Sequence, residues 1–168
     1  MTPLPPIRIG LGWDRHRLVP GRDCVLGGLR LPCEVGPAGH SDGDAVLHAL
    51  MDALLGAAGL DDLGTLFPDD DPRWEGASSL DLLDEVLARL RQVRMAPVSV
   101  DLVVACDRPR LAPHRASIRA LVAERLGLPV DRVNLKGKTT ESAGGPIETV
   151  ECHAVALLRE RRDEVGAD

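Results

Sequence analysis

Residues 39–60, GHSDGDAVLHALMDALLGAAGL, carry the strongest structural signal in this sequence. Its apolar residues recur at helical spacing, at Val46, Leu47, Leu50, Leu54 and Leu55. Ser41 or Asp42 can cap the start of this helix, and Asp44 is expected in its first turn, where a negative charge suits the helix dipole. The stretch therefore predicts one long amphipathic helix with acidic and hydroxyl side chains at its N-terminus.

The remaining elements are predicted on either side of this helix. We expect strands at 7–14, 98–106, 132–138 and 148–158, a hairpin at 24–31, and further helices at 78–94 and 114–128. Gly56 and Gly59 mark the end of the first helix, and Gly127 with Pro129 stops the last one. Because hairpin and crossover connections are mixed, the predicted class is α+β: a mixed β-sheet with about three helices packed on one face.

Length and composition indicate one domain. The chain has 168 residues, of which 44% are hydrophobic, so it can bury a core built from aliphatic side chains. We expect a flexible N-terminal tail at 1–6, a single domain at 7–160 and a charged C-terminal tail at 161–168. The net charge of −6 argues against a general nucleic-acid binder, but it allows a small anionic substrate in a locally cationic site.

The sequence also indicates the compartment. It has no apolar run long enough to span a bilayer, and its N-terminus lacks the pattern of a signal peptide, so we expect a cytoplasmic protein without a membrane partner. The four cysteines form no close pair such as CxxC. Free thiols in a reducing compartment are therefore favoured over disulfides.

A candidate metal site begins in the sequence GWDRHRL. Asp14 and His16 alternate, so in an extended chain both side chains point to one face. His48 lies four residues from Asp44 and from Asp52, on one face of the helix. If that face packs on the first strand, Asp14, His16 and His48 converge as three N and O ligands with an open position, as in catalytic zinc sites. Asp44 or Asp52 can then orient His48. On spacing alone, a chance pair and a core histidine remain alternatives.

Three further segments each have a functional and a structural interpretation. HSDGD (40–44) can bind an anion at the helix N-terminus, or it is a plain cap. KGKTTE (136–141) combines two lysines, two hydroxyls and Glu141, which suits a phosphate with a hard divalent cation, or it is an exposed strand end. CDRPRLAPH (106–114) can read a base edge through backbone groups, or it simply connects a strand to a helix.

Taken together and in this order, the segments resemble the 2-C-methyl-D-erythritol 2,4-cyclodiphosphate synthase family. The match extends from about Arg8 to about Leu158, and its longest block is far too specific to arise by chance. The matching stretches are RIGLGWDRHRL (8–18), GGLRLP (27–32), AGHSDGDAVLHALMDALLGAAGLDDLGTLFPDDDP (38–72), DRPRLAPH (107–114) and VNLKGKTTE (133–141).

The resemblance implies a homotrimer with active sites at the subunit interfaces. Such enzymes convert 4-diphosphocytidyl-2-C-methyl-D-erythritol 2-phosphate to the 2,4-cyclodiphosphate and CMP, in the non-mevalonate route to isoprenoids. It implies a Zn²⁺ ion on Asp14, His16 and His48, and a second divalent cation, Mg²⁺ or Mn²⁺, on Glu141. The nucleophile is the phosphate of the substrate itself, so no Ser or Cys nucleophile is needed.

The resemblance also assigns roles to further residues. Catalytic roles fall on His40, Lys138, Thr139, Thr140 and Glu141. Substrate contacts fall on Ser41, Asp52, Asp62, Gly64 and Asp69, and on the cytidine segment, at Cys106, Arg108, Pro109, Arg110 and Leu111. Lys138 stands where members usually carry a threonine, and 142–155 lacks the Phe and the Arg that many members have there.

Two other functions compete with a synthase. A metal-dependent phosphohydrolase would use the same metals to activate water, but the cytidine segment argues against it. A zinc-stabilised trimer that only binds isoprenoid or nucleotide ligands would not need two metal sites, so the complete set of ligands argues against it.

Overall fold

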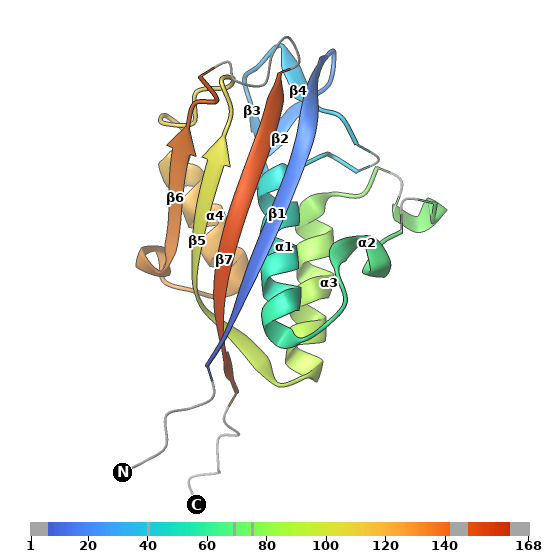
Figure 1. The fold of residues 1–168 in the computed structure, drawn as a ribbon, viewed down its shortest axis with the longest axis vertical. Helices are drawn as coiled ribbons and strands as arrows, with labels where there is room; N and C mark the ends of the chain where they lie inside the picture. The colour runs from blue at the N-terminus through green and yellow to red at the C-terminus, as the bar shows by residue number, and fades with distance from the viewer. Residues whose placement is uncertain (1–6, 40, 69, 75, 142–147, 162–168) are drawn as a thin grey trace, which may run out of the picture.

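The computed structural model describes residues 7–39, 41–68, 70–74, 76–141 and 148–161 (Figure 1). It contains a five-stranded sheet in the order β4-β1-β7-β5-β6 and a two-stranded hairpin. The elements are β1 (Ile7–Pro20), β2 (Cys24–Leu26), β3 (Leu29–Leu31), β4 (Val35–Pro37), α1 (Ala45–Ala58), α2 (Leu63–Leu66), η1 (Pro72–Trp74), α3 (Ser79–Gln92), β5 (Met95–Ala105), α4 (Arg115–Leu126), η2 (Val130–Arg132), β6 (Val133–Lys138) and β7 (Thr149–Glu160).

The large sheet is mixed, and one of its faces carries the long helices. β1 pairs antiparallel with β4 and with β7, β7 pairs antiparallel with β5, and only β5 and β6 are parallel. Figure 1 shows α1, α3 and α4 on the same side of this sheet, with α1 against β1 and β7 and with α4 beside β6. The predicted α+β class with about three helices on one face is confirmed.

Glycines on β1 bring α1 unusually close to the sheet. The side of β1 that faces α1 carries Gly10 and Gly12, followed at the same alternation by Asp14 and His16. A Cβ atom at Gly12 would lie 1.9 Å from the Ala49 carbonyl oxygen on α1, and one at Gly10 would meet the α1 backbone at 2.0 Å. The bare strand backbone is therefore the surface on which the helix rests, and Asp14 and His16 continue that surface.

The start of α1 differs from the prediction. Asp44 is the N-cap residue, rather than Ser41 or Asp42, and its carboxylate accepts from the backbone amides of Val46 and Leu47. An N-cap residue must satisfy amides that have no partner within the helix, and Asp44 is fully buried while doing so.

The same carboxylate also fixes the hairpin. Asp44 accepts from Gly27 N at 2.9 Å and from Gly28 N at 2.6 Å, at the turn between β2 and β3. Both glycines have positive φ angles of 62° and 80°, so the predicted turn around them is confirmed. One buried carboxylate thus ties the hairpin to the start of α1.

The bounds of other elements also differ from the prediction. Gly59 ends α1 in the left-handed conformation as predicted, but Gly56 lies inside the helix. β1 runs six residues beyond the predicted 7–14, β5 begins three residues before the predicted 98–106, and α2 and β4 were not predicted. The core is aliphatic, as expected, and α1 is its centre, with twelve buried residues of its fourteen. Among the described residues, no helix is long and apolar enough to cross a membrane.

Candidate active site

Asp14 and His16 of β1 meet His48 of α1 at one point. The His16 Nε2 atom lies 2.8 Å from Asp14 Oδ2, and His48 Nδ1 lies 3.1 Å from the same oxygen. The two imidazole nitrogens are 3.3 Å apart. The predicted convergence of the three side chains is confirmed, and they form a group that can hold a metal ion.

The donor set of this group suits a zinc ion, because two imidazole nitrogens and a carboxylate oxygen converge on one point. Zinc bonds of 2.0–2.2 Å in a tetrahedral arrangement separate neighbouring ligand atoms by about 3.3–3.5 Å, so the three ligand atoms, now 2.8–3.3 Å apart, would spread slightly around an ion. His16 Nδ1 lies 2.6 Å from the Ala38 carbonyl oxygen, which only accepts, so Nδ1 carries the proton and the Nε2 lone pair faces Asp14. His48 contacts this group through Nδ1, while its Nε2 lies 3.0 Å from Ser79 Oγ and 3.3 Å from Ser41 Oγ.

Asp14 and His16 shift each other's pKa values. Burial alone would raise the pKa of Asp14, but the contacts with His16 and His48 favour its ionised form and bring that pKa well below the ordinary value of 3.8. Burial lowers the pKa of His16, but the hydrogen bond and the charge of Asp14 outweigh it and raise that pKa above 6.5. An ionised carboxylate is therefore available as a metal ligand, and protons compete with a metal for His16.

A cavity of about 230 Å³ opens beside the three side chains. Of the residues predicted to contact substrate, Ser41, Asp52 and Gly64 line it. Its other wall is apolar and includes Phe67 and Trp74, whose rings pack edge to face at 4.9 Å. Neither aromatic residue was among the predicted site residues. We call Asp14, His16, Ser41, His48, Asp52 and Gly64 the metal-side group.

The structure corrects the roles of two carboxylates near His48. Asp44 was a candidate for orienting His48, but it caps α1 and holds the hairpin instead. Asp52, the other candidate, accepts from Leu63 N at 2.8 Å and so supports the start of α2. Asp62 is the exposed N-cap of α2 and accepts from Thr65 N at 2.8 Å, outside the residues that line the cavity.

The remaining predicted residues gather elsewhere, where β5 and β6 end. Cys106 N donates to the Lys138 carbonyl oxygen, and Thr140 donates to the Asp107 carboxylate through both its amide and its hydroxyl group. The Glu141 carboxylate accepts from the Thr139 hydroxyl. We call 106–111 and 138–141 the strand-end group. Asp107, which links its two segments, was not among the predicted site residues.

The two groups lie apart within one chain. Asp14 and His16 are on β1, whereas the strand-end group follows β5 and β6, with β7 between β1 and β5 (Figure 1). Three strand spacings separate β1 from β6, or about 14 Å. No described residue of the strand-end group lines the metal-side cavity. The predicted His40 and Asp69 lie outside the described residues.

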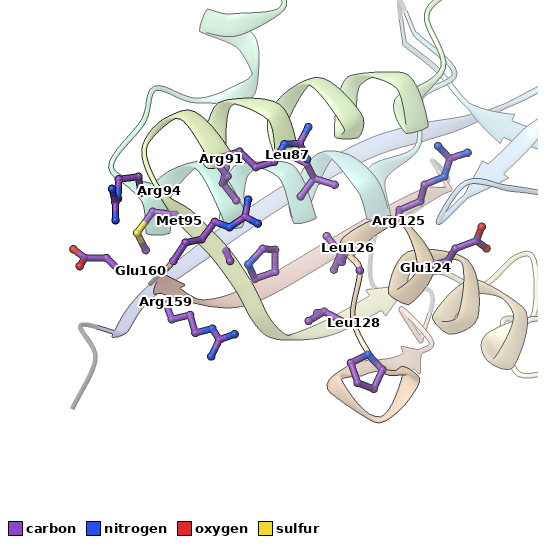
Figure 2. Close-up of a pocket in the computed structure, with 16 residues that line it drawn as sticks. Leu87, Arg91, Arg94, Met95, Glu124, Arg125, Leu126, Leu128, Arg159 and Glu160 are labelled. Carbon is purple, nitrogen blue, oxygen red and sulfur yellow. The ribbon is translucent and has the colours of Figure 1, made fainter. Parts of the chain in front are cut away.

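A larger pocket of about 1200 Å³ lies between the ends of α3 and α4 and the first residues of β5 (Figure 2). Arg91 and Arg125 belong to the last turns of α3 and α4, where cations offset the negative end of the helix dipole. None of the described residues predicted for the site lines this pocket.

Comparison with known proteins identifies the family of this chain. Residues 7–159 match the model of the YgbB family. A protein of Symbiobacterium thermophilum named 2-C-methyl-D-erythritol 2,4-cyclodiphosphate synthase is 49% identical over 155 residues, which are 91% of this chain and 99% of that protein. One of Aromatoleum aromaticum with the same name is 50% identical over 161 residues, which are 95% of this chain and 98% of that protein.

Solved structures give the same result. A structure of 2C-methyl-D-erythritol-2,4-cyclodiphosphate synthase in a CDP-bound form has 45% identity and a TM-score of 0.85, and the match covers 90% of this chain and 99% of that one. A CDP complex of the Plasmodium falciparum protein has 30% identity and a TM-score of 0.81, with 95% and 100% covered. The chain therefore belongs to the YgbB family, the family of the 2-C-methyl-D-erythritol 2,4-cyclodiphosphate synthases.

Proposed function

We propose that this protein is a metal-dependent lyase that converts 4-diphosphocytidyl-2-C-methyl-D-erythritol 2-phosphate to the 2,4-cyclodiphosphate and CMP. The observation that carries the proposal is the convergence of Asp14, His16 and His48 beside an open cavity. Relatives about half identical over nearly the whole chain, all named as this synthase, support the same reaction.

The reaction requires alignment and charge neutralisation rather than a protein nucleophile. An oxygen of the 2-phosphate attacks the β-phosphorus, and the bond from that phosphorus to the bridging oxygen breaks. CMP leaves with that oxygen and the bonding electrons, so atoms and charges balance without any other reactant. Holding the two phosphates in line is the principal task of such a site.

The residues of the metal-side group are suited to neutralising the charge of the β-phosphate. Asp14, His16 and His48 would hold Zn²⁺, which when bound supplies positive charge at the β-phosphate. Ser41 presents a hydroxyl group to the same cavity, and Gly64 leaves room there because it has no side chain. The apolar wall excludes water from the reacting phosphates and so favours cyclisation over hydrolysis.

The residues of the strand-end group are suited to binding phosphate and cytidine. Lys138 supplies a fixed cation, Thr139 and Thr140 supply hydroxyl groups, and Glu141 would hold Mg²⁺ or Mn²⁺. The 106–111 segment would bind cytidine, mainly through backbone groups. CDP complexes among the structural relatives support a cytidine site in this fold.

A complete site then needs two copies of the chain, which we propose assemble as a homotrimer. The face of the sheet opposite the helices exposes a strip of large apolar side chains on β1 and β7. Ile9 and Leu11 are 70% and 69% exposed, and Leu11 is paired with the exposed Val155. A contiguous apolar face of this kind is typical of a subunit interface. The strip consists of Ile7, Ile9, Leu11, Trp13 and Val155.

Product analysis tests the proposed reaction. The protein is incubated with the diphosphocytidyl substrate, with Zn²⁺ and Mg²⁺ and then after chelation, and the products are followed by ³¹P NMR. We expect CMP together with a cyclic diphosphate, and loss of both on chelation. Asp14→Asn should abolish turnover, while Asp131→Asn, at an exposed carboxylate of η2, should leave it unchanged.

The two competing functions give different products in the same experiment. A phosphohydrolase would release inorganic phosphate and leave no cyclic diphosphate. A protein that only binds ligands would retain the substrate and release no CMP. Either result would contradict the proposed synthase.

A further inference from the structure

His48 can bind a metal ion through Nδ1 only when the proton of its neutral imidazole is on Nε2. A neutral imidazole carries one proton, and the partner of one nitrogen decides which tautomer is present. We propose that Ser79, held by Asp42, is the positioning residue that fixes the proton of His48 on Nε2 and leaves Nδ1 free for the metal. This inference rests on the metal site of the proposed function.

The hydroxyl proton of Ser79 is held by Asp42. The Ser79 hydroxyl donates to Asp42 Oδ1 at 2.5 Å, and the Ser79 amide donates to Asp42 Oδ2 at 2.9 Å. An ionised carboxylate only accepts hydrogen bonds, so the single proton of the Ser79 hydroxyl is committed to Asp42. The Ser79 side chain is fully buried, so bulk solvent offers it no other partner.

The remaining lone pairs of the same oxygen are available to His48. Ser79 Oγ lies 3.0 Å from His48 Nε2, and with its own proton committed it can only accept at this contact. The contact with Ser79 therefore places a proton on His48 Nε2, and the Ser41 hydroxyl oxygen, 3.3 Å from the same nitrogen, can accept a hydrogen bond from it as a second partner. The Nδ1 lone pair is then directed at Asp14 and His16, which is the arrangement that a metal requires.

Ser79 and Asp42 are fixed in place because they lie at the starts of two helices. Ser79 is the first residue of α3, and Asp42 also accepts from Asp44 N, at the start of α1. The Asp42 carboxylate thus lies at the N-termini of two helices, where their dipoles stabilise a negative charge. The Asp42 carboxylate at this place keeps the hydroxyl proton of Ser79 turned away from His48.

The test compares Ser79→Ala with Ser78→Ala. Ser78 is the adjacent N-cap residue of α3 and accepts from Leu80 N, so its replacement perturbs the same helix start without touching His48. Long-range ¹H–¹⁵N correlation spectra of the metal-free proteins report which His48 nitrogen carries the proton. Competition with a chromogenic chelator then gives the Zn²⁺ affinity of each variant.

We expect Nε2–H at His48 in the unmodified protein and in Ser78→Ala, with the same Zn²⁺ affinity. Ser79→Ala should mix the tautomers and weaken Zn²⁺ binding about 10- to 100-fold, as is typical when a partner of a metal-bound histidine is removed. If Ser79→Ala does not fold, Asp42→Asn provides the test, because an amide can donate to Ser79 Oγ and turn its proton towards His48.

Two results would overturn the proposal. One is Nδ1–H at His48 in the unmodified, metal-free protein. The other is a folded Ser79→Ala protein with an unchanged tautomer and unchanged Zn²⁺ affinity. Failure of the proposed function is distinguishable from both, because it would appear as an unmodified protein that binds no Zn²⁺ or makes no cyclic product.

Discussion

Replacing Gly12 by alanine tests whether the close contact between β1 and α1 sets the metal geometry. The added Cβ atom would lie 1.9 Å from the Ala49 carbonyl oxygen and 2.6 Å from the Ala53 amide nitrogen. Ordinary contact begins at 3.4 Å, so α1 must move from the strand by about 1.5 Å. The clash is with backbone on both sides, and no side-chain rotation relieves it.

The displacement acts on stability and on the metal site at once. Overpacking of this kind costs about 1–3 kcal/mol of the free energy of unfolding, or more. His48 precedes Ala49 on α1, whereas Asp14 follows Gly12 on β1, so the ligands separate as the elements do. Metal sites tolerate errors of about 0.2 Å in ligand distance. The loss of Zn²⁺ affinity should therefore be larger than the loss of folding stability alone would cause.

Urea unfolding and Zn²⁺ competition measure the two effects separately. Gly56→Ala is the matched control, because that glycine lies in the same helix and an added Cβ would meet nothing within 4 Å. It should leave Zn²⁺ affinity unchanged and raise stability by about 0.5–1 kcal/mol through helix propensity. A Gly12→Ala protein that unfolds at the urea concentration of the unmodified protein and binds Zn²⁺ equally well would show that the contact between β1 and α1 does not set the metal geometry.

Three further predictions concern pH, thiols and assembly. Asp14 raises the pKa of His16 above 6.5 in spite of burial, so protons compete with Zn²⁺ for this ligand. The Zn²⁺ affinity, measured by competition with a chelator, should therefore already weaken as the pH falls towards 6.5. A constant affinity down to pH 6 would contradict this. Burial raises the pKa of three of the four free thiols, and the fourth, Cys33, is half-exposed. A thiol reagent should therefore modify at most one cysteine in the folded protein and all four after unfolding. Rapid modification of several cysteines in the folded protein would contradict this. Leu11→Glu should dissociate the oligomer in sedimentation experiments, and an unchanged mass would rule out this face as the interface.

The elements with strong local signals were predictable from the sequence. The helical spacing in 39–60 and the glycine pair of the hairpin gave α1 and the turn between β2 and β3, because local propensity and burial agree there. The convergence of Asp14 and His16 with His48 also followed from spacing, once the helix was placed on the strand. Strand ends were less certain because pairing partners, rather than local residues, decide where a strand stops.

Other features depended on tertiary contacts that no local pattern records. On β1 the usual rule is inverted: the glycines face the core, and the large apolar residues face outward, towards the proposed subunit interface. Asp44 was misplaced because its two amide partners in the hairpin are distant in the sequence. The sequence predicted a helix at 78–94, but nothing in the neighbours of Ser79 indicated that this residue contacts His48.

Mixing two inactive variants tests most directly whether an active site is built from two chains. His48→Ala destroys the metal-side group, and Glu141→Gln alters the strand-end group. In randomly mixed trimers of the two, about one quarter of the interfaces would combine an intact metal-side group with an intact strand-end group. We therefore predict that the mixture regains about one quarter of the unmodified activity, while each variant alone stays inactive. Mixed trimers, verified by two affinity tags, that remain as inactive as either variant would contradict the proposed shared site.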